Sequence, residues 1–289
     1  MKHLPVILLL SSLVVAGCQQ PSEVKLNPAD PDQELTVSSV VEPDTNEPST
    51  PDSTGLVVKD RNQFAGSLLV TSVKYDNGLG VATVSAATAV LEDRTKPPIL
   101  TASGKIAGYP GIFLGNSLKL NGVTMIRVTR MLAGVFAGWK YVGDLSLTYR
   151  PNQPYRWVAP ADPVGGIEDS IDSPIDSPDD LTVFSPHGGG VFSRNHDLEL
   201  RWKGQGTISI IIQAYEPLAK KTKPLLLITP KTNRGRAILG TKLLALLPRG
   251  RNFVFTFVLA NRRELTLPRY SGVVLIQAAS IYNSFVVIN

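Results

Sequence analysis

The chain has a single cysteine, Cys18, among its 289 residues. No disulfide can therefore form within one molecule, so the folded part must be held together by its apolar core. The position of this cysteine is informative too, because it directly follows an apolar run at the amino terminus.

The first 18 residues have the organisation of an export signal. A positive start with Lys2 is followed by an apolar stretch over residues 4–10 and by small residues that lead to Cys18. The stretch is too short to cross ~30 Å of hydrocarbon, so it does not predict a transmembrane helix. Residues 15–18, Val-Ala-Gly-Cys, resemble the lipobox of bacterial lipoprotein signal peptides. The resemblance implies cleavage after residue 17 and a lipid anchor on Cys18.

The residue after the cysteine bears on the destination of such a protein. In the lipoprotein sorting pattern, a residue other than Asp at this position implies the outer membrane, and here the residue is Gln19. We therefore expect a protein of the cell envelope that is lipid-anchored, with the outer membrane favoured over the inner membrane. The alternative is a plain secretory signal with an incidental thiol.

Composition divides the chain into five parts. Residues 1–17 are the predicted signal peptide, and residues 18–54, rich in Pro, Asp, Glu, Ser and Thr, predict the lipidated cysteine and a disordered spacer. Residues 159–180 contain a near repeat of Ile-Asp-Ser-Pro and predict an acidic linker. The remaining ranges, 55–158 and 181–289, are each of roughly 100 residues, an ordinary domain size.

Both of these ranges are predicted to be all-β. The strand-like runs 67–75 and 81–91 are separated by Asp76-Asn77-Gly78, and Asn-Gly between apolar runs is the strongest short hairpin signal. A short helix over 85–93 is the alternative to the second run. Further strands are predicted in the first range over 99–106, 123–131 and 139–149. In the second range they are predicted over 197–202, 208–215, 225–228, 253–259, 273–278 and 285–288. This even spacing is typical of sandwiches, so we expect two β-sandwich-like modules.

A family resemblance covers roughly residues 181–289. Residues 247–261 resemble the corner and following strand of fibronectin type III and related immunoglobulin-like modules. Residues 198–202, ending in Trp202, resemble the strand that carries their core tryptophan. The resemblance implies an immunoglobulin-like β-sandwich. It lacks the tyrosine-corner hydrogen bond, because Phe253 stands where those modules usually have Tyr, and it implies no particular activity.

Charge is distributed unevenly, although the net balance is only +5. Residues 19–60 hold nine acids and two bases, and residues 159–180 hold seven acids and no base, so each segment carries −7. Residues 61–157 hold eleven bases and four acids (+7), and residues 181–289 hold fifteen bases and four acids (+11). Two basic modules thus alternate with two acidic connecting segments.

Basic residues near the loops of the last module form the one predicted binding site. They are Lys220, Lys221, Lys223, Arg249, Arg251, Arg262 and Arg263. If the loops lie at one end of a sandwich, these residues would attract an envelope polyanion. A protein partner is the other possibility. The alternative is that the charge only keeps the domain dispersed. No specific recognition of nucleic acid is predicted.

The sequence predicts no catalytic residues, no metal site and no cofactor. His187 and His196 are nine residues apart without a third ligand at metal-like spacing, so we interpret them as exposed loop residues. The sequence also contains no Gly-x-Ser-x-Gly elbow of a serine hydrolase. We therefore predict a non-catalytic envelope lipoprotein that binds or organises a partner. Two alternatives remain open: an enzyme that acts on envelope polysaccharide or peptide through an unrecognised site, and a structural subunit of a surface or secretion assembly joined by strand addition.

Overall fold

The computed structural model describes residues 35–39, 64–115, 117–144, 147–162, 167–216, 221–249 and 251–289. These residues form an all-β protein with one four-residue helix, α2 (Thr241–Leu244), which confirms the predicted fold class. None of the described helices is long and apolar enough to span a membrane. The predicted signal peptide, Cys18, Lys220 and most of the predicted spacer lie outside the described residues.

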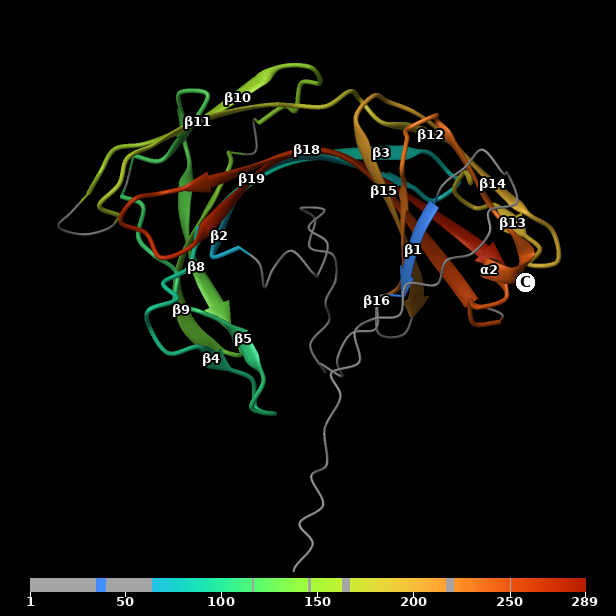
Figure 1. Cartoon of the computed structure of the whole chain (residues 1–289), viewed down its shortest axis with the longest axis horizontal. Coiled ribbons are helices and arrows are strands. Elements are labelled where there is room, and N and C mark those ends of the chain that lie inside the picture. The colour runs from blue at the N-terminus through green and yellow to red at the C-terminus, as the bar shows by residue number, and fades with distance from the viewer. Residues whose placement is uncertain are drawn as a thin grey trace, which may run out of the picture.

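One ten-stranded sheet organises the molecule and curves into an arch (Figure 1). Its order is β1 (Leu35–Ser39), β16 (Lys221–Pro230), β15 (Thr207–Glu216), β18 (Arg251–Thr266), β19 (Val273–Ile288), β2 (Gly66–Asp76), β3 (Val81–Leu91), β9 (Val135–Val142) and β8 (Ile126–Leu132). The tenth strand, β13 (Val191–Phe192), pairs with the end of β19. Neighbours are antiparallel, except that β19 runs parallel to β2 and to β13.

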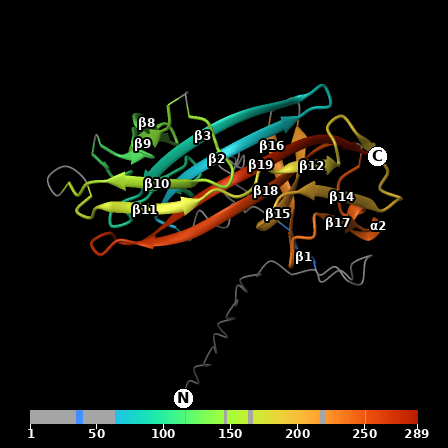
Figure 2. The ribbon, with the colours of Figure 1, turned by 90° about the horizontal axis from the view of Figure 1, so that it is seen from above.

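Three smaller sheets complete the fold. The first has the order β11 (Ile171–Asp176), β10 (Pro154–Ala159), β6 (Lys119–Leu120) and β7 (Val123–Thr124). The second consists of β12 (Thr182–Ser185), β14 (Leu198–Lys203) and β17 (Arg236–Leu239), and the third of β4 (Ile99–Leu100) and β5 (Ile106–Gly108). Strands β10 and β11 cover one half of the outer face of the arch, and β12 and β14 cover the other half (Figure 2).

Two apolar cores lie between these layers. One is built from β2, β3 and β10 and includes the fully buried Trp157. The other is built from β14, β15, β16 and β18 and includes Trp202, whose ring centroid lies 5.9 Å from that of Phe257. Strand β19 contributes to both cores, with Val274 in the first and Val286 in the second. Each half is therefore a sandwich, but the two sandwiches share one continuous back sheet.

The structure corrects the prediction of a linker over residues 159–180. Residues 171–176 form β11, in which Ile171, Ser173 and Ile175 are buried while the residues between them are exposed. β11 pairs with β10 along its whole length. Two of the seven acids that suggested a linker, Asp172 and Asp176, lie on the outward face of this strand, because successive side chains of a strand point to opposite sides.

The predicted division between residues 55–158 and 181–289 was also wrong. Strand β2 pairs with β19 in parallel from Gly66–Val274 to Asp76–Ser284, so the main sheet runs through both ranges without a break. β19 itself is one strand where two were predicted.

Two local predictions also differ from the structure. The prediction of a disordered spacer was wrong at Leu35–Ser39, which forms β1. Residues 99–106 contain a hairpin in place of one strand. The strand predicted over 81–91 is confirmed, against the alternative of a short helix over 85–93. Trp202 is buried in its core, as the immunoglobulin-like resemblance implied.

Candidate functional site

Strand β1 closes one edge of the ten-stranded sheet. It pairs antiparallel with the second half of β16, in a register that sets Leu35 opposite Pro230 and Val37 opposite Ile228. Val37 is buried in the core around Trp202, and Leu35 packs against that core. Alternating apolar residues let five residues of chain supply both a strand and two core side chains.

The first half of β16 continues this edge beyond β1. Residues 221–225 have no strand beside them on the outer side within the described part of the chain. Lys221 lies opposite Glu216 of β15, and Lys223 lies opposite Ala214. Glu216 also pairs with Arg251 at 3.6 Å, but both side chains are about half exposed, so this ion pair contributes little to stability.

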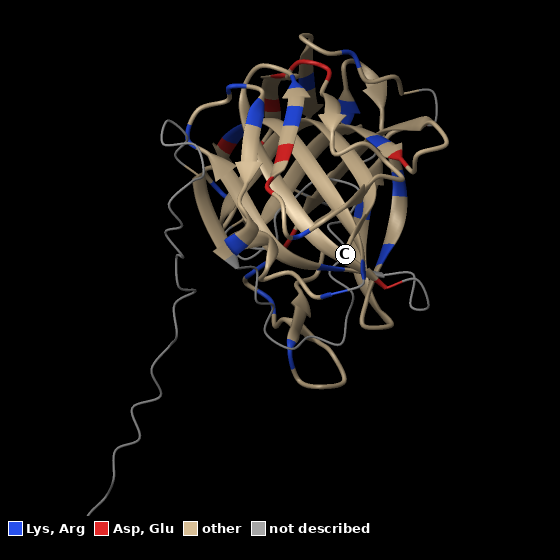
Figure 3. Ribbon diagram, turned by 90° about the vertical axis from the view of Figure 1, so that its right-hand side faces the viewer, with Lys and Arg blue, Asp and Glu red and all other residues tan. Residues whose placement is uncertain are grey.

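The structure therefore brings only some residues of the predicted basic site close together. Lys221 and Lys223 lie at the start of β16 and Arg251 at the start of β18, on either side of the end of β15, and Arg249 lies two residues before β18. Lys and Arg are visible on several separate strands and loops when the molecule is seen from this side (Figure 3). Anion binding by these residues remains a prediction.

Arg262 and Arg263 do not belong to this group. They lie eleven and twelve positions after Arg251 on the same strand, a separation of roughly 35–40 Å at the usual rise per residue. Arg263 donates from Nη1 to the backbone oxygen of Pro174 in β11 at 3.3 Å. The length of β18 thus places these two arginines in the other half of the molecule.

A buried polar row crosses the strands next to this edge. Gln213 donates from Nε2 to Thr256 Oγ1 at 2.8 Å, and Thr256 Oγ1 donates to Asn283 Oδ1 at 2.7 Å. These side chains lie on the sheet face opposite to the two cores, since their neighbours Ile212, Phe255 and Tyr282 point into a core. Gln213 Oε1 is buried without a hydrogen-bond partner, which costs roughly 1–3 kcal/mol.

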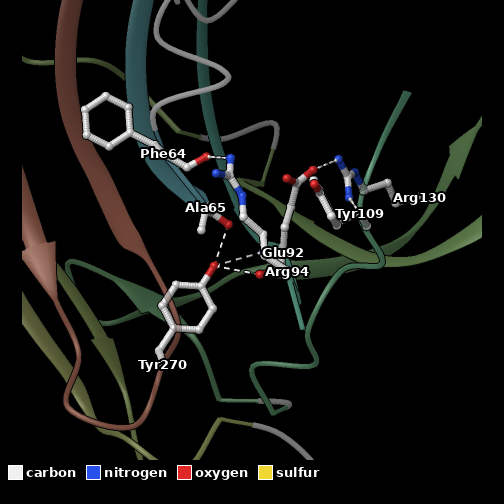
Figure 4. A network of polar contacts seen from close by, with 7 residues as sticks. All are labelled: Phe64, Ala65, Glu92, Arg94, Tyr109, Arg130 and Tyr270. Carbon is white, nitrogen blue, oxygen red and sulfur yellow. Dashed lines mark hydrogen bonds and ion pairs between the residues drawn. The ribbon is translucent and has the colours of Figure 1, made fainter. Parts of the chain in front are cut away.

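A second polar network lies at the opposite half of the sheet (Figure 4). The Tyr270 hydroxyl contacts the backbone oxygens of Ala65 and Glu92, and burial raises its pKa well above the ordinary value. The Glu92 carboxylate pairs with Arg130, and Arg130 also donates to the backbone oxygen of Tyr109 at 2.8 Å. Arg94 donates to the backbone oxygen of Phe64. The Glu92 and Arg130 side chains are only about 15% exposed, and each serves to join segments of the fold.

Asp76 joins the two halves of the chain. Its carboxylate accepts hydrogen bonds from Gly188 N at 2.8 Å, Gly78 N at 3.0 Å and the Tyr282 hydroxyl at 3.0 Å. Burial alone would raise the pKa of Asp76, but these hydrogen bonds and the nearby His187 outweigh it, so the pKa lies below its ordinary value. The loop around His187 is thus held by a carboxylate that requires no metal. Among the described residues, no group of three His, Cys, Asp or Glu could hold a metal ion.

Comparisons with known proteins give little further information. No protein-family model matches the chain, and no curated protein matches it significantly. One solved structure with some likeness is the crystal structure of DIP-gamma IG1+IG2. It is 10% identical and covers 75% of this chain and 97% of that chain, with a TM-score of 0.16. A TM-score this low is too slight to establish a shared arrangement of strands.

Proposed function

We propose that this chain is a non-catalytic binding protein of the cell envelope, anchored through lipid on Cys18 and favouring the outer membrane. Its immunoglobulin-like half would present the partially covered edge of β16 to an extended, acidic segment of a protein partner. The observation that carries this proposal is the edge itself: β1 pairs with residues 226–230, and the lysine-bearing residues 221–225, which pair with β15 on one side, have no described strand on the other side.

The chemistry of this edge supports an extended partner. A strand edge offers backbone N–H and C=O groups at regular spacing, and a further strand can add to it. β1 is the example within the chain: an extended segment with apolar residues at alternate positions already binds this edge. Beyond β1, Lys221 and Lys223 would favour a partner strand with acidic residues, through attraction that weakens as salt rises.

The test is a pull-down with the full chain carrying Cys18→Ser, from detergent-solubilised envelopes. We expect a retained protein partner whose binding falls at least about tenfold in the Lys221→Glu/Lys223→Glu variant, a change of about 1.4 kcal/mol. Lys203→Glu is the matched control, because Lys203 is exposed on β14 of another sheet. Equal retention by the β16 variant and by the control would rule out this edge as the binding surface.

The anchor is tested separately. We expect the wild-type chain in the membrane fraction with fatty acid attached, and the Cys18→Ser chain in the soluble fraction. A Cys18→Ser chain that remains membrane-bound, with a wild type that takes up no labelled fatty acid, would refute the lipid anchor.

A further inference from the structure

Residues 94–143 have an unusual charge composition. This stretch of fifty residues contains seven Lys and Arg side chains and no Asp or Glu. Its strands β4, β5, β8 and β9 lie together at the end of the arch that is opposite to β1 (Figure 1). One end of the protein is therefore built from a segment without a single acidic side chain.

The same segment carries most of the exposed large apolar side chains. Of the thirteen in the described part of the chain, seven fall here: Leu100, Ile106, Val123, Ile126, Met131, Val135 and Phe136, each about half exposed or more. The β5 strand lies against β8, since a Cβ on Gly108 would come within 2.8 Å of Leu132. The exposed apolar residues thus gather on neighbouring hairpins and are not scattered singly over the surface.

The tip of the β8–β9 hairpin is entirely apolar. Leu132 pairs with Val135 across the two-residue turn Ala133-Gly134, in which both residues have positive φ. Turns of this kind usually contain Asn, Asp or Gly, which are readily exposed to solvent. Here the tip reads Met-Leu-Ala-Gly-Val-Phe over residues 131–136, and Met131, Val135 and Phe136 are each 55% exposed.

Aromatic and cationic side chains lie along the β8–β9 hairpin behind this tip. The Arg127 guanidinium lies 4.5 Å from the ring centroid of Trp139 and 5.0 Å from that of Phe113. Phe136 contacts Trp139 edge to face at 5.5 Å. Lys140 is exposed on β9, and Lys119 is exposed on β6 of another sheet. Trp and Arg side chains have large apolar parts and polar ends. They therefore favour the boundary between acyl chains and head groups.

We propose that the β8–β9 tip, residues 131–136, inserts into the surface of an anionic phospholipid bilayer. The apolar tip enters the head-group region, while Arg127, Lys119 and Lys140 bind phosphates. A soluble protein partner would also cover an apolar patch, but the excess of cations favours a surface of uniform negative charge, since the neighbouring acids Glu92 and Asp93 are paired with Arg130 and Lys96. All residues of this proposed membrane contact belong to the described part of the chain, and the contact does not depend on the lipid at Cys18.

The test uses the full chain with Cys18→Ser and sedimentation with vesicles. We expect binding to vesicles of mixed phosphatidylcholine and phosphatidylglycerol, and much weaker binding to phosphatidylcholine alone. Phe136→Ser should weaken binding at least about tenfold, because full burial of one such side chain changes an equilibrium constant by one to two powers of ten. Leu79→Ser is the matched control, since Leu79 is 94% exposed at the tip of the β2–β3 hairpin.

Tryptophan fluorescence gives an independent measurement. Trp157 and Trp202 are buried, so a blue shift on adding vesicles reports on the partly exposed Trp139. Thermal unfolding of each variant shows whether the fold is kept. No vesicle binding by the Cys18→Ser chain, unchanged binding by Phe136→Ser, or self-association that is lost in Phe136→Ser without vesicle binding would each overturn the proposal. Failure of the lipid anchor alone would leave it standing.

Discussion

Replacing Asp76 by Ala should destabilise the protein strongly, because its carboxylate holds two halves of the chain together. Gly188 N and the Tyr282 hydroxyl are buried donors that would lose their acceptor, whereas Gly78 N lies closer to solvent and can bind water. Each buried donor left unpaired costs about 1–3 kcal/mol. We therefore expect the free energy of unfolding to fall by about 2–6 kcal/mol.

The pH dependence of the Asp76→Asn variant separates the contribution of the carboxylate charge to stability from the contribution of the side chain's shape. The folded state lowers the pKa of Asp76 below its ordinary value of 3.8, so the carboxylate stabilises the fold at neutral pH. That stabilisation is lost as the pH falls through the folded-state pKa. Urea unfolding of wild type and Asp76→Asn, followed by tryptophan fluorescence, should therefore differ at pH 7, and the difference should shrink at a pH below the ordinary pKa of 3.8. This reasoning would be refuted if the Asp76→Asn variant lost the same free energy of unfolding at both pH values. It would also be refuted if the free energy of unfolding of Asp76→Ala lay within about 0.5 kcal/mol of that of wild type.

Three further predictions concern single contacts. Gly188→Ala should destabilise the protein in thermal unfolding, because its Cβ would lie 2.3 Å from the Asp76 carboxylate; an unchanged midpoint would contradict this. Tyr270→Phe should lower the free energy of unfolding by about 1–3 kcal/mol, since buried backbone oxygens lose a donor, and urea titration measures the change. Val37→Asp should release β1, because it places a charge in an apolar core, and limited proteolysis should then cleave near residue 37 while the rest of the sheet persists. Protection equal to wild type would show that β1 remains bound.

Local patterns predicted most of the strands, and the clearest case is the β2–β3 hairpin. Its Asn-Gly signal and flanking apolar runs depend only on neighbouring residues, so the observed strands match the predicted ones to within one residue. β11 could also have been recognised, because Ile-Asp-Ser-Pro-Ile-Asp alternates with a period of two. Composition was given more weight than periodicity there, and that led to the wrong linker.

The continuity of β19 could not be predicted from its own residues. The predicted strands 273–278 and 285–288 leave a gap that holds Ser280 and Ser284. In the structure Ser280 Oγ accepts from Leu181 N at 3.0 Å, and Ser284 Oγ donates to Pro186 O at 2.6 Å. Both partners are nearly a hundred residues away, so only the assembled fold explains why buried hydroxyls are tolerated in this strand.

The predicted basic site was incomplete for a similar reason. Nothing in the sequence between Arg251 and Arg263 marks the uninterrupted length of β18, so loop residues were expected where the structure has strand. The apolar hairpin tip at residues 131–136 was missed because residues 132–136 fall in the connection between the predicted strands 123–131 and 139–149, and their exposure was not considered. The signal that could have found it is the run of fifty residues without an acid.

The shared strand β19 also determines the order in which the molecule can fold. The core around Trp157 needs Val274, Ile276 and Ala278, which are made about two hundred residues after β2. Until that strand emerges, the earlier half has the sandwich partner β10 but lacks the neighbour of β2, so the growing chain cannot close its first core. Such distant pairing slows folding and keeps the early half open. If the chain is exported, as we propose, this late completion would be an advantage.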